Sequence, residues 1–338
     1  MIPIGSFTCR GVPDRDETAR HRAHLFPIGM KWRFLSVAHA RSGQTRGAPR
    51  RHCRHPLDPL PSARGSILTL AQHLAAAGIV AVITGICYGR SMLDPSGGLA
   101  AWVVGYVALA FGGVSIFSAL LGFFLAVNVV RRVASRTLSH RLPPGYEPVG
   151  AKGSRRDAWQ IFANGGVALA LVPVFHFAPT AAILAALLGS IAASSADTFA
   201  SELGVYARKA PVLITTLQPI AAGLSGGVSL TGNVAAAVGA LVPLALYNLT
   251  GGKTSPSLWA ACLLAGIGGS TIDSLVGALW QEKRSCPSCS RLTERPEHCG
   301  VPTVHAGGVA GLGNDVVNLV GSATGAIIAA GVSLAWPP

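Results

Sequence analysis

Acidic residues stand at the ends of two long apolar runs in this sequence. Asp197 and Glu202 follow a run that begins near Thr180, and Asp273 lies near the end of a later run. Because charge is costly in hydrocarbon, acids at the end of a membrane helix point to a function. The structural alternative is a helix-end carboxylate paired with Arg or Lys or, for Glu202, a solvated interfacial acid.

Carboxylates in this position suit a magnesium site. Mg²⁺ is typically held by one or two carboxylates together with substrate phosphates. The predicted Mg²⁺ ligands are Asp197, Glu202, Asp273 and Asp315, of which Asp197 and Asp273 are also the predicted catalytic residues. Nearby serine and threonine residues, such as Ser194 and Ser195, are interpreted as packing groups that bond to local backbone.

Basic side chains and paired glycines near these acids are typical of a phosphate-binding site. Phosphoryl transfer needs mainly positioning and charge neutralisation, which basic groups and free backbone N–H groups at helix starts can supply. The alternative for the glycines is close helix packing. The predicted binding residues for a nucleoside triphosphate are Arg155, Arg156, Arg208, Lys209, Gly226, Gly227 and Asn314.

Three cysteines cluster in one loop, residues 284–305, with the spacing of a metal site. Cys286 and Cys289 form a Cys-x-x-Cys pair, and Cys299 follows with His298 or His305 as a fourth ligand. The pattern predicts structural Zn²⁺ held by Cys286, Cys289, Cys299 and His298. A flexible loop without metal is the alternative.

The composition indicates the elements that must position these groups. The chain is 50% hydrophobic and 12% charged, with a mean hydropathy of +0.47, whereas soluble domains carry about 25% charged residues. Apolar runs of about 20 residues can each span a bilayer. The sequence therefore predicts an all-α, polytopic transmembrane helical bundle of about eight spans: 67–87, 98–113, 115–130, 158–175, 180–198, 221–248, 258–280 and 309–335.

The basic residues that give the net charge of +13 are distributed as membrane topology predicts. Basic residues in the loops after the third, fifth and seventh spans all fall on one face, which the positive-inside rule places in the cytoplasm or in an organelle's stroma or matrix. Because these basic residues flank apolar spans, nucleic acid is not an expected partner, and the lipid bilayer is. The break between 98–113 and 115–130 is expected at Gly112–Gly113.

Residues 1–65 differ from the membrane domain predicted at 66–338. They are rich in Arg, His, Pro and Ser and lack apolar periodicity, so they are predicted to be a disordered basic tail. A transit peptide and a mis-assigned start, with Met30 as one candidate true start, are the two alternatives. A transit peptide would place the protein in the plastid envelope.

An internal repeat is visible across the second half of the chain. Asp197-Thr198 and Asp273-Ser274 are each followed by a basic pair and then by a Gly-Gly-Val-x-x-x-Gly-Asn segment, at 226–233 and 307–314. One return helix separates the copies. The copies are therefore predicted to be parallel repeats with the same orientation, which brings both acids to the basic face.

Six motifs, covering the chain from about Ser91 to the C-terminus, resemble the transmembrane-protein-19-like family, also called domain of unknown function 92. They are Ser154–Gly166, Ser195–Gly204, Leu213–Thr216, Leu224–Ser229, Ser270–Ala278 and Asn314–Asn318. The resemblance implies a multi-pass membrane protein. Through the plant phytyl-phosphate kinase of tocopherol synthesis, it also implies a nucleotide-dependent kinase of isoprenoid monophosphates.

Three functions remain open from the sequence. One is a Mg²⁺-dependent kinase that phosphorylates phytyl or another prenyl monophosphate with a nucleoside triphosphate. A second is a secondary transporter, which needs its polar site near the middle of the membrane. A third is a non-catalytic membrane scaffold, in which the acids would have no reason to converge.

Overall fold

The computed structural model describes residues 69–142 and 155–337. In these residues, seven helices are long and apolar enough to cross a membrane. They are α1 (Leu70–Gly89), α2 (Pro95–Thr137), α3 (Ala158–Phe177), α4 (Ala181–Gly204), α5 (Leu230–Leu249), α6 (Pro256–Leu279) and α7 (Asn314–Ala335), with a short 3-10 turn at Ser139–Arg141. The predicted helical membrane bundle is confirmed.

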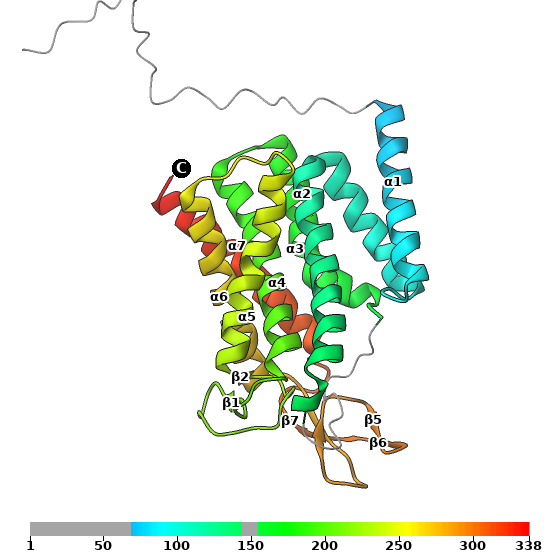
Figure 1. Ribbon diagram of the computed structural model, residues 1–338, viewed down its shortest axis with the longest axis vertical. Helices are drawn as coiled ribbons and strands as arrows, with labels where there is room; N and C mark the ends of the chain where they lie inside the picture. Colours follow the sequence, from blue (N-terminus) through cyan, green and yellow to red (C-terminus); the bar gives the residue numbers. More distant parts are fainter. Residues whose placement is uncertain (1–68, 143–154, 338) are drawn as a thin grey trace, which may run out of the picture. The chain divides into compact units, whose positions relative to one another are not determined.

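The long helix α2 consists of two helical segments joined at Gly113, whose φ of 78° and ψ of −179° are not helical. The chain turns back there, so the two segments run in opposite directions (Figure 1). Just after the turn, the Ser115 hydroxyl donates to the Thr250 carbonyl (3.0 Å) at the end of α5. Counting α2 as two segments gives eight crossings in the described residues, as the sequence predicts.

Helix α4 is the centre of the bundle, with 72% of its apolar window buried. Small residues on its surface allow neighbouring helices to approach closely. Ser195 Oγ donates to the Gly239 carbonyl of α5 (2.7 Å), and Ser194 Oγ donates to the Asn164 carbonyl of α3 (3.0 Å). The predicted packing role of these serines is confirmed, but their predicted bonding to local backbone is wrong, because both hydrogen bonds run to other helices.

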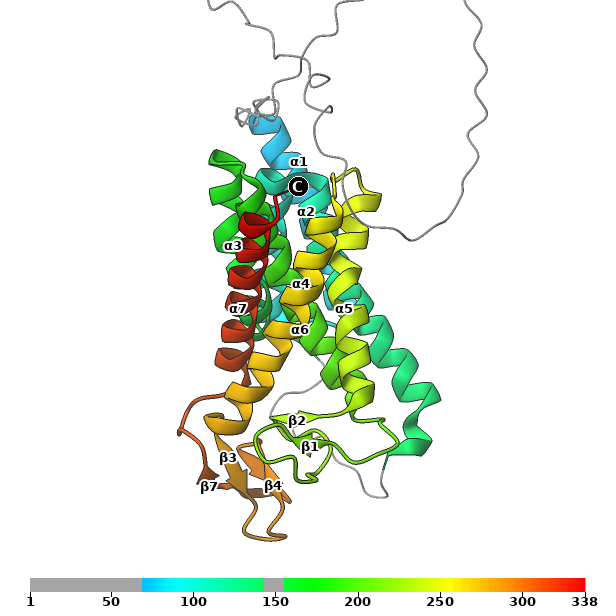
Figure 2. The ribbon, with the colours of Figure 1, turned by 90° about the vertical axis from the view of Figure 1, so that its left-hand side faces the viewer.

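Short strands fill the loops at the end of the bundle where α4 and α6 finish (Figures 1 and 2). They form a β1–β2 pair, a three-stranded β4–β3–β7 sheet and a β5–β6 pair, all antiparallel. The bounds are β1 Val212–Leu213, β2 Gly227–Val228, β3 Lys283–Ser285, β4 Leu292–Thr293, β5 Glu297–His298, β6 Val301–Pro302 and β7 Val304–Gly307.

Two predicted spans begin too early. The span predicted to start at residue 221 contains β2, because Gly227 and Val228 pair with Leu213 and Val212 instead of joining α5. The span predicted to start at residue 309 becomes helical only at Asn314. The paired glycines therefore precede α5 and α7 and do not form their first turns.

The predicted repeat corresponds to two copies of one arrangement. In the first copy α4 leads through β1 and β2 to α5, and in the second α6 leads through β3 to β7 to α7. Both α4 and α6 run toward the strand-bearing end of the bundle, and both α5 and α7 run back (Figure 2). The two copies therefore have the same orientation.

The described basic residues gather at this end, which we call the basic face. It carries the end of α2, the start of α3 and the loops after α4 and α6, whereas Lys253 lies in the loop between α5 and α6 at the opposite end (Figure 1). The predictions for residues 1–65, including the transit peptide and the alternative start at Met30, concern residues outside the described ranges.

Candidate functional site

The carboxyl groups of Asp197 on α4 and Asp273 on α6 are neighbours in one cavity. They occupy equivalent positions in the two repeat copies, and the parallel orientation of α4 and α6 brings them to one level of the bundle. Two carboxyl groups in contact must share either a proton or a cation, because two bare negative charges at this separation repel strongly. The predicted convergence of the two acids is confirmed.

Polar groups from the surrounding helices orient this carboxyl pair. Ser270 Oγ donates to Asp197 Oδ1 (3.3 Å) from one turn earlier on α6. The amide of Asn318 on α7, oriented so that both its oxygen and its nitrogen are bonded, donates to Asp273 Oδ2 (3.0 Å). In each acid these bonds use one carboxylate oxygen and fix the orientation of the group. The other oxygen remains for the partner acid or for a ligand.

The pair lines a polar cavity of about 510 Å³ at the basic-face end of the bundle. We call it the acidic cavity. Of the residues predicted from the sequence, its lining includes Asp197, Glu202, Asp273, Asp315, Arg156, Gly226, Gly227 and Asn314. Among the described residues, all four predicted Mg²⁺ ligands therefore border one space.

Three of the predicted phosphate-binding side chains lie elsewhere. Arg155 is exposed and donates to Ser91 Oγ (3.1 Å) outside the cavity. Arg208 and Lys209 are exposed in the loop after α4 and do not line the cavity. Adjacent residues in a loop point in different directions, so Arg155 and Arg156 have different surroundings.

Arg156 is the basic side chain that lines the cavity among the residues that the structure describes, and Glu202 holds it there. Its Nη2 lies 3.5 Å from Glu202 Oε1, and the same carboxylate oxygen accepts from Arg131 Nε (2.9 Å). Burial, followed by the neighbouring Arg131 charge, lowers the pKa of Arg156 to about 10, although Glu202, Asp157 and Asp315 oppose this shift. Arg156 is therefore still cationic at neutral pH.

Glu294 is a cavity residue that the sequence did not single out. It follows β4 in the cysteine-containing loop, and its Oε1 and Oε2 accept from the Ser225 N–H (3.0 Å) and Gln281 Nε2 (2.9 Å). Burial raises the pKa of Glu294, and the hydrogen bonds from Ser225 partly oppose this shift. No local pattern marks Glu294, because its role depends on how the loop folds back.

The depth of the carboxyl pair is set by its position along the helices. Asp197 lies seven residues before the end of α4, and Asp273 lies six residues before the end of α6. At 1.5 Å per residue, both acids lie roughly 10 Å from the helix ends at the basic face. Both acids therefore lie inside the helices instead of at their ends, in the half nearer the basic face but slightly closer to the midpoints of these 24-residue helices than to the ends.

An apolar pocket of about 120 Å³ adjoins the acidic cavity. Side chains of α1, α2 and α3 line it, including Val80, Phe117 and Phe124. The two spaces share part of their walls, namely Arg156, Gln160, Asn164 and Thr198. A hydrocarbon chain in this pocket would therefore end beside the polar groups of the cavity.

Comparison with known proteins agrees with the membrane architecture. The family model described as "Integral membrane protein DUF92" matches residues 78–326. The chain is 31% identical to an uncharacterised membrane protein of Methanocaldococcus jannaschii, over 64% of this chain and 86% of that protein. It is 30% identical to Protein PGR of Arabidopsis thaliana, over 69% of this chain and 86% of that protein. No solved structure matches the chain.

Proposed function

We propose that this chain, which belongs to the integral membrane protein family DUF92, transfers a phosphoryl group from a nucleoside triphosphate to an isoprenoid monophosphate in the acidic cavity. The observation that carries the proposal is the contact between Asp197 and Asp273 in a polar cavity at one membrane face. The expected substrates are phytyl phosphate or another prenyl phosphate.

Asp197 and Asp273 are the proposed Mg²⁺ ligands, and Asp315 is proposed to assist them. Glu202, a predicted Mg²⁺ ligand, instead pairs with Arg131 and Arg156. The donor set consists of carboxylate oxygens with amides close by, which are the hard ligands that Mg²⁺ prefers. When bound, Mg²⁺ would neutralise charge on the triphosphate during transfer. The two helices meet with the acids already in contact, so the chain itself positions the ligands.

The transfer step requires few groups from the protein. An oxygen of the acceptor monophosphate forms a bond to the γ-phosphorus, the bond from that phosphorus to the bridging oxygen breaks, and nucleoside diphosphate leaves. A phosphate monoester is largely dianionic at neutral pH, because its second pKa is about 6, so the attacking oxygen needs no general base. Arg156 would hold transferring phosphate oxygens, with Glu202 and Arg131 fixing its position.

The apolar pocket supports a lipid acceptor. It shares Arg156 and Thr198 with the acidic cavity, so a chain lying among the side chains of α1, α2 and α3 could present its phosphate to Arg156. Loop residues of the basic face, such as Gly223 and Glu294, line the cavity, which supports access from that face over a carrier site with access from both. The convergence of the two acids argues against a purely structural scaffold.

The decisive experiment is a turnover assay of the purified protein with phytyl phosphate, Mg²⁺ and each of ATP, GTP, CTP and UTP. We expect phytyl diphosphate to form, and Asp197→Asn and Asp273→Asn each to lower the rate roughly 100-fold or more, since each removes charge stabilisation from the transition state. The matched control is Glu297→Gln, which alters an exposed acid outside the cavity.

A second measurement separates binding from turnover. Electron paramagnetic resonance with Mn²⁺ in place of Mg²⁺ should show a bound ion in the unaltered protein and its loss in both variants. Turnover that survives both substitutions would contradict the role of the carboxyl pair. Absence of product with all four nucleotides, or uptake of phytyl phosphate into proteoliposomes without phosphorylation, would contradict a kinase.

A further inference from the structure

The loop between α6 and α7 presents its cysteines on two adjacent turns. Cys286 and Cys289 lie in the turn that joins β3 to β4, where the Cys286 N–H donates to the Arg291 carbonyl (3.0 Å). His298 and Cys299 lie at the turn that joins β5 to β6. Ser290 and Cys299 adopt positive φ values of 58° and 55°, which are uncommon for residues other than glycine and tighten both turns.

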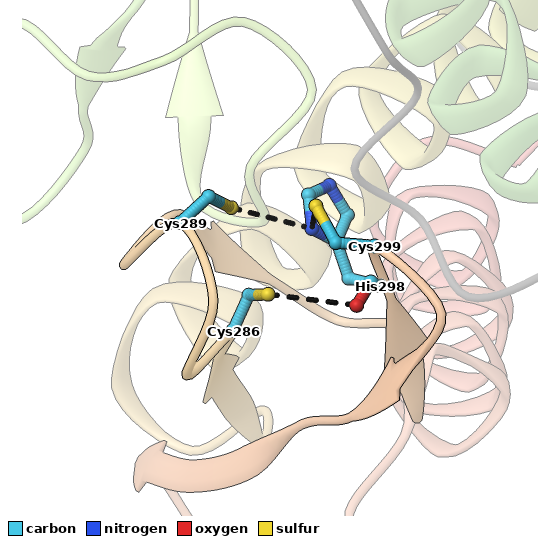
Figure 3. Close-up of side chains that lie close together, drawn as sticks. All are labelled: Cys286, Cys289, His298 and Cys299. Carbon is cyan, nitrogen blue, oxygen red and sulfur yellow. Dashed lines mark hydrogen bonds between the residues drawn. The ribbon is translucent and has the colours of Figure 1, made fainter.

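The four side chains of these turns point toward one another (Figure 3). One ligand atom from each of Cys286, Cys289, His298 and Cys299 lies within 4.8 Å of all the others. His298 Nδ1 is 3.4 Å from Cys289 Sγ and 3.2 Å from Cys299 Sγ. Tetrahedral zinc with Zn–S bonds of 2.3 Å separates its sulfur ligands by roughly 3.8 Å, which fits this cluster.

The structure also decides between the two histidines. His305 lies on β7, and its Nδ1 is 3.5 Å from Glu282 Oε1, in an ion-pair group with Arg284. His298 is the histidine whose ring nitrogen lies between the thiols. All three cysteines are free of disulfide bonds, so their sulfur atoms are available as ligands.

We propose that Cys286, Cys289, His298 and Cys299 bind one structural Zn²⁺. Four protein ligands fill a tetrahedral shell and leave no open position for substrate, which is the pattern of structural zinc sites. The loop also needs such support, because Cys286 is the only buried apolar side chain between residues 283 and 307. A segment with so little apolar core gains its folding free energy from the metal.

Zinc in this position would stabilise one wall of the acidic cavity. Glu294, which lines the cavity, follows β4 directly, and β4 is held between the two ligand-bearing turns. Thr303 links this segment to the sheet, since its Oγ1 donates to the Arg295 carbonyl (2.6 Å) and accepts from Arg284 Nε (2.8 Å). Loss of zinc should therefore free Glu294 from Ser225 and Gln281.

The test is the metal content of the intact protein purified in detergent, measured by mass spectrometry, with cobalt substitution to report ligands by visible absorption. We expect roughly one zinc per chain and the absorption of a site with three thiolates and one imidazole. His298→Ala should lose the zinc, whereas His298→Cys should keep it with a four-thiolate spectrum.

The matched controls are His305→Ala, which removes the rival ligand, and Cys87→Ser, which alters a buried cysteine outside the loop. Both should retain zinc. A protein purified without zinc or with iron in its place would overturn the proposal, as would zinc that survives His298→Ala. These readouts do not depend on turnover, so the zinc site and the kinase activity can fail separately.

Discussion

At the scale of single residues, the acidic cavity depends on which neighbouring side chains enter it. Arg155 and Arg156 are adjacent in the chain, yet Arg156 is paired with Glu202 at the cavity while Arg155 is exposed. Two like residues with different surroundings form a natural internal control. The carboxylate of Glu202 bonds both Arg131 and Arg156, so it sets the position of the cavity's cation.

We expect Arg156→Gln to lower phosphoryl transfer by roughly 10- to 1,000-fold, because it removes a cation that would stabilise phosphate charge in a water-poor site. The same exchange at Arg155 should leave the rate within about twofold, since surface contacts of exposed charges are weak. Turnover of phytyl phosphate measures both variants. Equal losses of rate in the two variants would contradict this prediction, because they would show that the rate depends on positive charge in general and not on a cation in the cavity.

At the scale of the elements, the hairpin within α2 decides how the first half of the chain packs. Gly113 has φ 78° and ψ −179°, a conformation that is essentially restricted to glycine. The turn brings the end of α2 back to the basic face, where Arg131 reaches Glu202 on α4. A single glycine far from the cavity therefore helps to place one of its charged neighbours.

Gly113→Ala should destabilise the protein by about 1–3 kcal/mol, because a Cβ makes this backbone conformation costly. Gly98→Ala in the same helix is the control. A Cβ at Gly98 meets no atom within 4 Å, so alanine there should be neutral or stabilising by up to about 1 kcal/mol. Thermal unfolding in one detergent compares the pair, and equal midpoints would contradict the strained turn.

At the scale of the whole molecule, the distribution of basic residues and the directions of the helices indicate the same orientation in the membrane. The end of α2, the start of α3 and the loops after α4 and α6 carry most of the described basic residues at one end of the bundle, and α7 runs from that end to the other (Figure 2). Under the positive-inside rule the basic face is cytoplasmic or its organellar equivalent. The acidic cavity opens among the same loops. This orientation turns it toward the cytoplasm or its organellar equivalent, which is the compartment that contains nucleotides.

This topology predicts the behaviour of reporter fusions in a bacterial host. Alkaline phosphatase fused after the last residue should be active and green fluorescent protein fused there dark, because α7 ends on the face opposite the basic loops. Fusions made after Lys209, in the loop following α4, should give the reverse result. The same reporter activity at both positions would contradict the arrangement of α4 to α7.

Much of the bundle could be predicted because its signals are local. Apolar length marks each crossing, and Gly112–Gly113 marks the break in α2. The repeated Asp and Gly-Gly-Val pattern indicated that Asp197 and Asp273 lie at one level. The sequence predicts the starts of α5 and α7 too early, because residues 221–229 and 309–313 are apolar enough for a helix, and a pairing partner such as Val212–Leu213 is not visible locally.

The sequence alone determined that this chain crosses a membrane about eight times and carries its acids in the half of the bundle nearer the basic face. Only the tertiary structure decided that Glu294 reaches the cavity, that Arg155, Arg208 and Lys209 do not line it, and that His298 rather than His305 meets the cysteines. The physical reason is that hydrophobic length is a property of each segment, whereas the meeting of polar side chains depends on helix rotation and loop folding between distant segments.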